Sequence, residues 1–210
     1  MPYVRPPIPR QVFTAADGTS YEYGGRWSDR PPEATYSHDS HPERFAPLHD
    51  VADALVAHLL ERYEVTRDDS APFTLSCVGP AVRAVRLTPT MPDAAPLTLA
   101  WLRYPGIGVK AGAAYESVFP ICGCDACDEP VESEADGLER LVLGVADGLF
   151  AESVTHDGIT WSLTQPDGWA GGGSTPADVT ESARVRRLLP AAGEAWRPWP
   201  ARRRTRTAEF

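Results

Sequence analysis

The fold is decided by the extended run Leu97-Thr-Leu-Ala-Trp-Leu-Arg-Tyr104 and by the two extended segments that follow it, at 107–112 and 115–121. Apolar side chains at 97, 99 and 101 alternate with Thr98 and Ala100, which is the period-two pattern of a strand with one buried face. Pro105-Gly106 separates the first two segments by only a few residues. Because parallel strands need a crossover of a dozen or more residues, the three segments predict an antiparallel meander.

Further extended runs lie on both sides of this meander. Phe73–Val78 and Val82–Thr88 precede it, and Ile159–Leu163 follows it with period-two alternation. Near the start, short β-prone runs flank Asp17-Gly18, which predicts a hairpin.

Apolar residues at three- and four-residue steps between His41 and Val65 predict a helix. Proline cannot lie deep inside a helix, so we expect a short turn at 41–45 and a main helix from Pro47. Ser40 and Glu43 have the spacing of a capping box for that first turn.

A second apolar stripe predicts a helix from about Glu134 to Val154, with Ser133 as its N-cap. Gly171–Gly173 is interpreted as a flexible break. A short third helix is expected to open at Thr175-Pro176.

This order of elements predicts an α+β, two-layer fold in which an antiparallel β-meander carries helices packed mainly on one face. With 210 residues, the chain has the length of one domain with tails. We expect an N-terminal hairpin and proline-rich arm at 1–35, a single α+β domain at 36–190, and a flexible tail rich in Arg, Pro and Trp at 191–210. Trp196 and Trp199 cannot form a core within that tail, so docking back onto the domain is the favoured interpretation.

A formal net charge of −9 disfavours general binding to nucleic acid or anionic membranes. No stretch approaches the roughly 20 apolar residues of a membrane helix, and the first residues lack the apolar run of a signal peptide. We therefore expect a cytoplasmic protein with reduced thiols. The arginines at 202, 203, 204 and 206 indicate a solvated tail, with nucleic-acid contact as the alternative.

Three of the four cysteines, Cys122, Cys124 and Cys127, fall within six residues in a predicted loop. Thiolates suit Zn²⁺, and Gly123 allows a sharp turn between two of them, so the pattern favours a zinc site. Structural zinc usually has four ligands. Candidates for the fourth are Cys77, a histidine such as His41 or His49, and the carboxylates Asp125 and Asp128.

Two other interpretations of these thiols stay open, which are an inert buried turn and a redox pair. The redox interpretation is disfavoured because the acidic residues around the cysteines should raise the pKa values of the thiols.

The segment Ile121-Cys-Gly-Cys-Asp-Ala-Cys-Asp-Glu129, together with His41-Pro-Glu-Arg-Phe-Ala-Pro-Leu-His49, resembles an uncharacterised actinobacterial domain-of-unknown-function family. Ser37, Tyr23-Gly, Arg26-Trp27 and Pro31-Pro-Glu33 fit the same pattern. The resemblance spans roughly 23–163 and implies no activity, ligand or catalytic residue.

The sequence lacks the phosphate-loop, nucleophile-elbow and HExxH patterns of three common enzyme classes. We interpret the chain as a small non-enzymatic binding module, zinc-stabilised through the CxCxxC loop, for a protein or small ligand. The alternatives are a metal-dependent enzyme with an open zinc coordination position and nucleic-acid contact through the arginine-rich tail.

Overall fold

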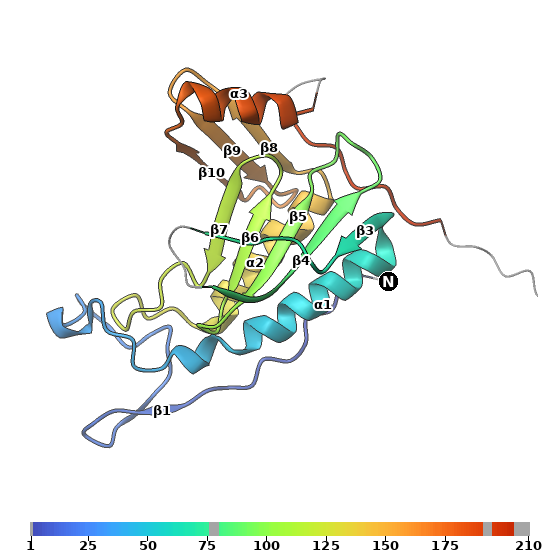
Figure 1. Cartoon of the computed structure of the whole chain (residues 1–210). Coiled ribbons are helices and arrows are strands. Elements are labelled where there is room, and N and C mark those ends of the chain that lie inside the picture. The colour runs from blue at the N-terminus through green and yellow to red at the C-terminus, as the bar shows by residue number, and fades with distance from the viewer. Residues whose placement is uncertain (1, 76–79, 191–194, 204–210) are drawn as a thin grey trace, which may run out of the picture.

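The larger sheet has five antiparallel strands in the order β3-β4-β5-β6-β7 in a computed structural model of the chain, which describes residues 2–75, 80–190 and 195–203 (Figure 1). The strands are β3 (Val65–Asp68), β4 (Ala81–Pro89), β5 (Leu97–Leu102), β6 (Ile107–Ala111) and β7 (Tyr115–Phe119). Each pairs in antiparallel register with its neighbour. The predicted meander is confirmed.

The expected strand Phe73–Val78 is wrong over residues 73–75, because these residues belong to no sheet. Residues 76–78 of the expected strand lie outside the described residues. Its place beside β4 is taken by β3, a short polar strand that the hydrophobic pattern does not signal.

The sheet is buried on both faces at β5. One face packs against α1 (Pro47–Arg62) and α2 (Val131–Ala146), and on it Trp101 Nε1 donates to the His49 carbonyl oxygen at 3.2 Å. The opposite face is crossed by the chain before β4, where the Phe73 ring lies over Gly108. A Cβ at Gly108 would lie 2.6 Å from Cζ of Phe73, so only glycine fits beneath that ring.

The first helical segment has the predicted form, with a 3₁₀ turn at Pro42–Phe45 and α1 starting at Pro47. The predicted capping box is wrong. His41 is the N-cap of the turn and makes no side-chain cap, and the Ser40 hydroxyl donates instead to Asp125 at 2.6 Å.

The second helix is shorter and earlier than predicted. α2 starts after Pro130, so Ser133 is not its N-cap, and it ends before Asp147-Gly148. Gly148 has a φ of +71°, a conformation that glycine adopts without strain and that stops the helix. Residues 150–154 form a strand instead.

That strand belongs to a second sheet, with β8 (Phe150–Val154), β9 (Ile159–Thr164) and β10 (Ala170–Thr175) in the order β10-β9-β8. The flexible break expected at Gly171–Gly173 is wrong, because these glycines pair with β9. α3 (Val179–Leu188) packs on this sheet, and Asp178 Oδ1 caps it by accepting from the Glu181 N–H at 2.8 Å.

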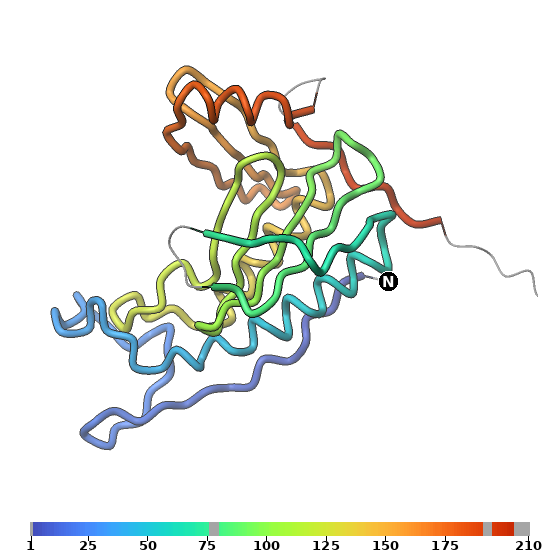
Figure 2. The backbone as a smooth tube through the Cα atoms, in the orientation of Figure 1, coloured from blue at the N-terminus to red at the C-terminus, as the bar shows by residue number. Residues whose placement is uncertain are grey.

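Both ends of the described chain pack on the helices and sheets. The predicted hairpin forms from β1 (Phe13–Thr14) and β2 (Ser20–Tyr21), and before it the chain runs beside α1 (Figure 2). Trp196 and Trp199 are each 3% exposed, so both dock back onto the core. The domain boundaries stay a prediction.

Candidate metal centre

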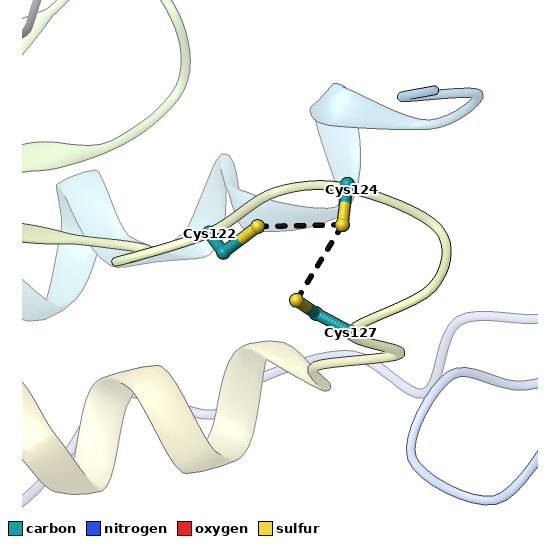
Figure 3. A group of neighbouring side chains, drawn as sticks. All are labelled: Cys122, Cys124 and Cys127. Atoms are coloured by element: carbon teal, nitrogen blue, oxygen red, sulfur yellow. Dashed lines mark hydrogen bonds between the residues drawn. The ribbon is translucent and has the colours of Figure 1, made fainter. Parts of the chain in front are cut away.

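The three clustered cysteines lie in the cysteine loop, residues 121–129, which joins β7 to α2. Their side chains point toward a common centre (Figure 3). The Sγ atoms of Cys122 and Cys124 are 3.3 Å apart, those of Cys124 and Cys127 are 3.4 Å apart, and all three lie within 4.8 Å of one another. The thiols are free and not joined by disulfides.

These separations are close to those of a zinc–thiolate site. Zn–S bonds of about 2.3 Å in tetrahedral geometry place neighbouring sulfurs about 3.8 Å apart. A small outward movement of each thiolate would therefore admit an ion at the common centre. The three cysteines could hold a metal ion.

Asp125, a residue of the loop that is 4% exposed, connects the loop to the N-terminal part of the chain. Its carboxylate accepts hydrogen bonds from the Tyr23 hydroxyl at 2.8 Å and from the Ser40 hydroxyl at 2.6 Å. Its backbone N–H donates to the His38 carbonyl oxygen at 2.7 Å. The N-terminal part of the chain thus holds the loop at the position between Cys124 and Cys127.

Arg26 makes a second set of contacts to the loop. Its Nε atom and its backbone N–H both donate to the Asp128 carboxylate at 2.8 Å. The guanidinium lies over the rings of Tyr21, Tyr23 and Trp27, at 4.8, 4.2 and 4.8 Å from their centroids. Aromatic faces attract a cation and limit its movement, so Arg26 is held where it positions Asp128.

Arg44 also contacts the loop, and its side chain is 2% exposed. It donates to the carbonyl oxygens of Gly123 at 2.7 Å and His41 at 2.9 Å, and it lies 3.5 Å from the Asp39 carboxylate. A buried guanidinium satisfied in this way fixes the backbone on both sides of it. The thiols therefore converge on a backbone that is already braced without any ion.

The sequence left a fourth ligand open, and the described residues supply none. Asp125 and Asp128 are turned toward Ser40, Tyr23 and Arg26. Among the candidate histidines, His41 contacts Glu43 and His49 contacts the Gly106 carbonyl oxygen. Cys77 lies outside the described residues. Within the described part of the chain, the converging group consists of the three cysteines.

The thiols differ in acidity. Burial alone would raise the pKa of Cys124, but hydrogen bonds from the backbone N–H groups of Cys127 and Ala126 and from the neighbouring thiols bring it below its ordinary value. Hydrogen bonding to the other two thiols raises the pKa of Cys127 to about 12. The expectation that nearby carboxylates would raise the thiol pKa values is wrong for Cys124, because the hydrogen bonds from backbone N–H groups and neighbouring thiols lower the pKa of this thiol.

Gly123 packs against Tyr104 inside the loop. A Cβ at this position would overlap the Tyr104 hydroxyl oxygen and would lie 3.1 Å from Cζ. We expect Gly123→Ala to lower the free energy of unfolding by about 1–3 kcal/mol, the usual effect of overpacking. In urea denaturation, Tyr104→Phe should restore most of this loss in the double variant, since it removes the overlapped oxygen. Equal damage with and without that oxygen would contradict the assigned contact.

Glu134 gives the region a pH dependence. It lies in the first turn of α2 at 8% exposure, and burial, followed by the charge of Glu129, raises its pKa from 4.5 to about 7. The folded chain therefore binds this proton more tightly than the unfolded chain. The resulting stability is fully present below pH 4.5 and is lost as pH rises through about 7.

Glu134→Gln stays uncharged at every pH. As pH rises from 5 to 8, wild type loses stability and the variant does not. We expect the difference between their free energies of unfolding to grow by roughly 3 kcal/mol in favour of the variant. Urea midpoints of both reduced, chelator-treated proteins at the two pH values measure this difference. A variant that differs from wild type by the same amount at both pH values would show that Glu134 does not titrate in this range.

The model of one protein family, described as a family of unknown function (DUF6226), matches residues 9–203. The chain belongs to this family. The DUF6226 match covers the hairpin, both sheets, the cysteine loop and the docked tryptophans. No curated protein and no solved structure matches the chain.

Sequence reasoning found the thiols of this DUF6226 chain but missed the residues that brace them. Arg26 and Arg44 entered the sequence analysis only as parts of the motifs that carry the family resemblance, with no contact to the cysteines expected. The alternative of tail contact with nucleic acid stays untested: Arg202 donates to the Tyr63 carbonyl oxygen at 3.2 Å, and Arg204 and Arg206 lie outside the described residues. In the described part of the chain, no helix has the length and apolar character needed to cross a membrane.

Proposed function

We propose that the chain is a non-enzymatic binding module of the cytosol in which a zinc ion, held by Cys122, Cys124 and Cys127, fixes the loop between β7 and α2. The observation that carries this proposal is the convergence of three sulfurs on a loop that the buried Arg44 and the half-buried Arg26 brace. The Sγ atoms of Cys122 and Cys124 are 3.3 Å apart and those of Cys124 and Cys127 are 3.4 Å apart. A prebuilt site of this kind loses little conformational entropy when it binds an ion.

Zinc is the ion that this donor set favours in a reducing compartment. Thiolates are soft ligands, and zinc takes them in tetrahedral sites without redox chemistry. Binding would also favour the ionised thiols, so the high pKa of Cys127 is no obstacle to coordination.

A structural role is favoured over a catalytic one by the surroundings of the thiols. In the described part of the chain, no histidine or carboxylate joins the converging group. A cavity beside the β6–β7 turn and a smaller one between Tyr23 and Pro130 both have linings without a cysteine. Three thiolates also neutralise most of the charge of a zinc ion, which weakens its ability to acidify a bound water.

Competition titration tests the proposal. Reduced protein, purified without a metal-binding tag, is titrated with zinc against a chromogenic chelator of known affinity. We expect one tight equivalent per chain for wild type, and at least a hundredfold weaker binding after Cys122→Ser, Cys124→Ser or Cys127→Ser.

Ser153→Ala is a matched control, because it removes a polar side chain from β8, outside the cysteine loop. It should bind zinc as wild type does. Wild-type protein that fails to compete with the chelator would refute the proposal, and so would cysteine variants that compete equally well.

The proposed binding partner is a protein or a small ligand. The net charge of −9 argues against nucleic acid and anionic membranes as partners.

A further inference from the structure

A cavity of about 510 Å³ lies at the other end of β7 from the cysteine loop. Its floor is the turn between β6 and β7, and its walls come from β9 of the second sheet and from α3. Figure 1 shows the β6–β7 turn beneath α3 and beside β9. The volume falls within the range of about 300–1,000 Å³ that small-ligand sites occupy.

One part of this cavity is aromatic and apolar. Tyr115 and Trp161 meet edge to face, with ring centroids 4.7 Å apart, and both are only partly buried. Ile159 and Pro176 extend the apolar surface beside them. This wall could receive a flat apolar group of aromatic size.

The rim of the cavity carries three cations from three different elements. Lys110 on β6 is paired with Glu116 at 2.5 Å, and Arg184 on α3 is paired with Glu181 at 2.7 Å. Arg86 on β4 makes no ion pair with the described residues. Its cross-strand neighbour Asp68 accepts from the N–H and hydroxyl of Ser70 at Oδ1, at 2.8 and 2.7 Å. These hydrogen bonds lower the pKa of Asp68, the charge of Arg86 contributes a small part of that shift, and the two side chains form no ion pair.

The buried carboxylate of Glu152 also borders the cavity, but its oxygens are occupied. They accept hydrogen bonds from three successive backbone N–H groups, at 113–115, and from Trp196 Nε1. A carboxylate satisfied by four donors has little capacity left to bind a cationic ligand. Among the described residues that line the cavity, the cation with no carboxylate at ion-pair distance is therefore Arg86, while the charge of Glu152 faces its own four donors.

We infer that this cavity binds a small organic carboxylate with a flat apolar body. The carboxylate contacts the guanidinium of Arg86, and the apolar body packs on Tyr115 and Trp161. This site goes beyond the proposed zinc centre, and because the two lie at opposite ends of β7, either can fail while the other stands.

Naphthaleneacetate and its neutral analogue naphthaleneacetamide are suitable probes, since they share one ring system and differ in charge. Binding to the full-length protein is measured by isothermal titration calorimetry and equilibrium dialysis. We expect wild type to bind the acid roughly tenfold more tightly than the amide, the usual magnitude of one charge-assisted hydrogen bond. Arg86→Gln should remove this preference and leave amide binding unchanged.

Arg83→Gln is the matched control. Arg83 lies on the same strand three residues earlier, opposite Trp101, so its side chain is on the other face of the sheet. The Arg83→Gln variant should retain the tenfold preference for the acid over the amide. Trp161→Leu should weaken the binding of both probes, and circular dichroism checks that it folds.

Three results would overturn the inference. They are absence of binding of both probes to wild type at millimolar concentration, equal affinity of wild type for acid and amide, and equal effects of the Arg86 and Arg83 substitutions. Repeating the titration with zinc and with chelator should give the same affinities, which separates this result from the outcome at the cysteines.

Discussion

Saturating zinc is expected to raise the Tm of the reduced protein by about 8–16 °C above its value in chelator. A ligand at 1,000 times its dissociation constant stabilises the folded state by about 4 kcal/mol. For a chain of roughly this size, each kcal/mol shifts Tm by about 2–4 °C. The effect should be large here because the ion would join the end of β7 to the start of α2, which carries much of the core.

Cysteine variants give this prediction its controls. After Cys124→Ser, added zinc should shift Tm by less than about 2 °C, since two thiolates hold zinc weakly. Cys77→Ser leaves only the three clustered thiols in the chain. If it keeps the full shift, three thiolates suffice. If it loses part of the shift, Cys77 supplies a fourth ligand and the centre still stands. An equal shift in wild type and Cys124→Ser would contradict the account.

Replacing Glu152 by alanine is expected to lower the free energy of unfolding by about 4 kcal/mol, since each buried donor left without its acceptor costs about 1–3 kcal/mol. The side chain is 1% exposed and joins the β6–β7 turn, β8 and the docked C-terminal segment. Its loss would leave three backbone N–H groups and Trp196 Nε1 without their acceptor.

Two further variants separate this network from a general surface effect. Glu152→Gln keeps the size and one acceptor, so urea denaturation should show roughly half the loss. Glu116→Ala removes an exposed carboxylate from β7, after the β6–β7 turn, and should change stability by about 0.5 kcal/mol or less. A Glu152→Ala protein within about 1 kcal/mol of wild type would show that the four hydrogen bonds contribute little.

The meander could be predicted because its strands alternate locally and its turns contain proline and glycine. Of the second sheet, only β9 could be predicted in this way. Leu149 and Phe150 continue the apolar stripe of α2 beyond the point where Gly148 ends the helix, so periodicity alone extends it too far. The glycines of β10 appear flexible in isolation. They form a strand by pairing with β9, and glycine is needed there because the rings of Trp161 and Trp169 occupy the space that side chains at Gly173 and Gly171 would need.

The same limit applies at the candidate site. The spacing of the three cysteines is local information, and their convergence followed from it. The bracing contacts join residues 79–102 positions apart, such as Arg44 to Gly123 and Tyr23 to Asp125. No pattern within one segment encodes such a pairing. Ser40 is an example: its spacing to Glu43 predicts a helix cap, but its hydroxyl donates to Asp125 in the cysteine loop.

Zinc K-edge X-ray absorption on the reduced protein, purified without a metal-binding tag and analysed for metal content, tests the central claim most directly. We expect one zinc per chain with at least three sulfur neighbours at about 2.3 Å, and fewer sulfur neighbours after Cys124→Ser. Protein that retains less than about a tenth of an equivalent of zinc after incubation with the ion, or zinc surrounded mainly by nitrogen and oxygen, would contradict the claim that these three thiols form a metal centre.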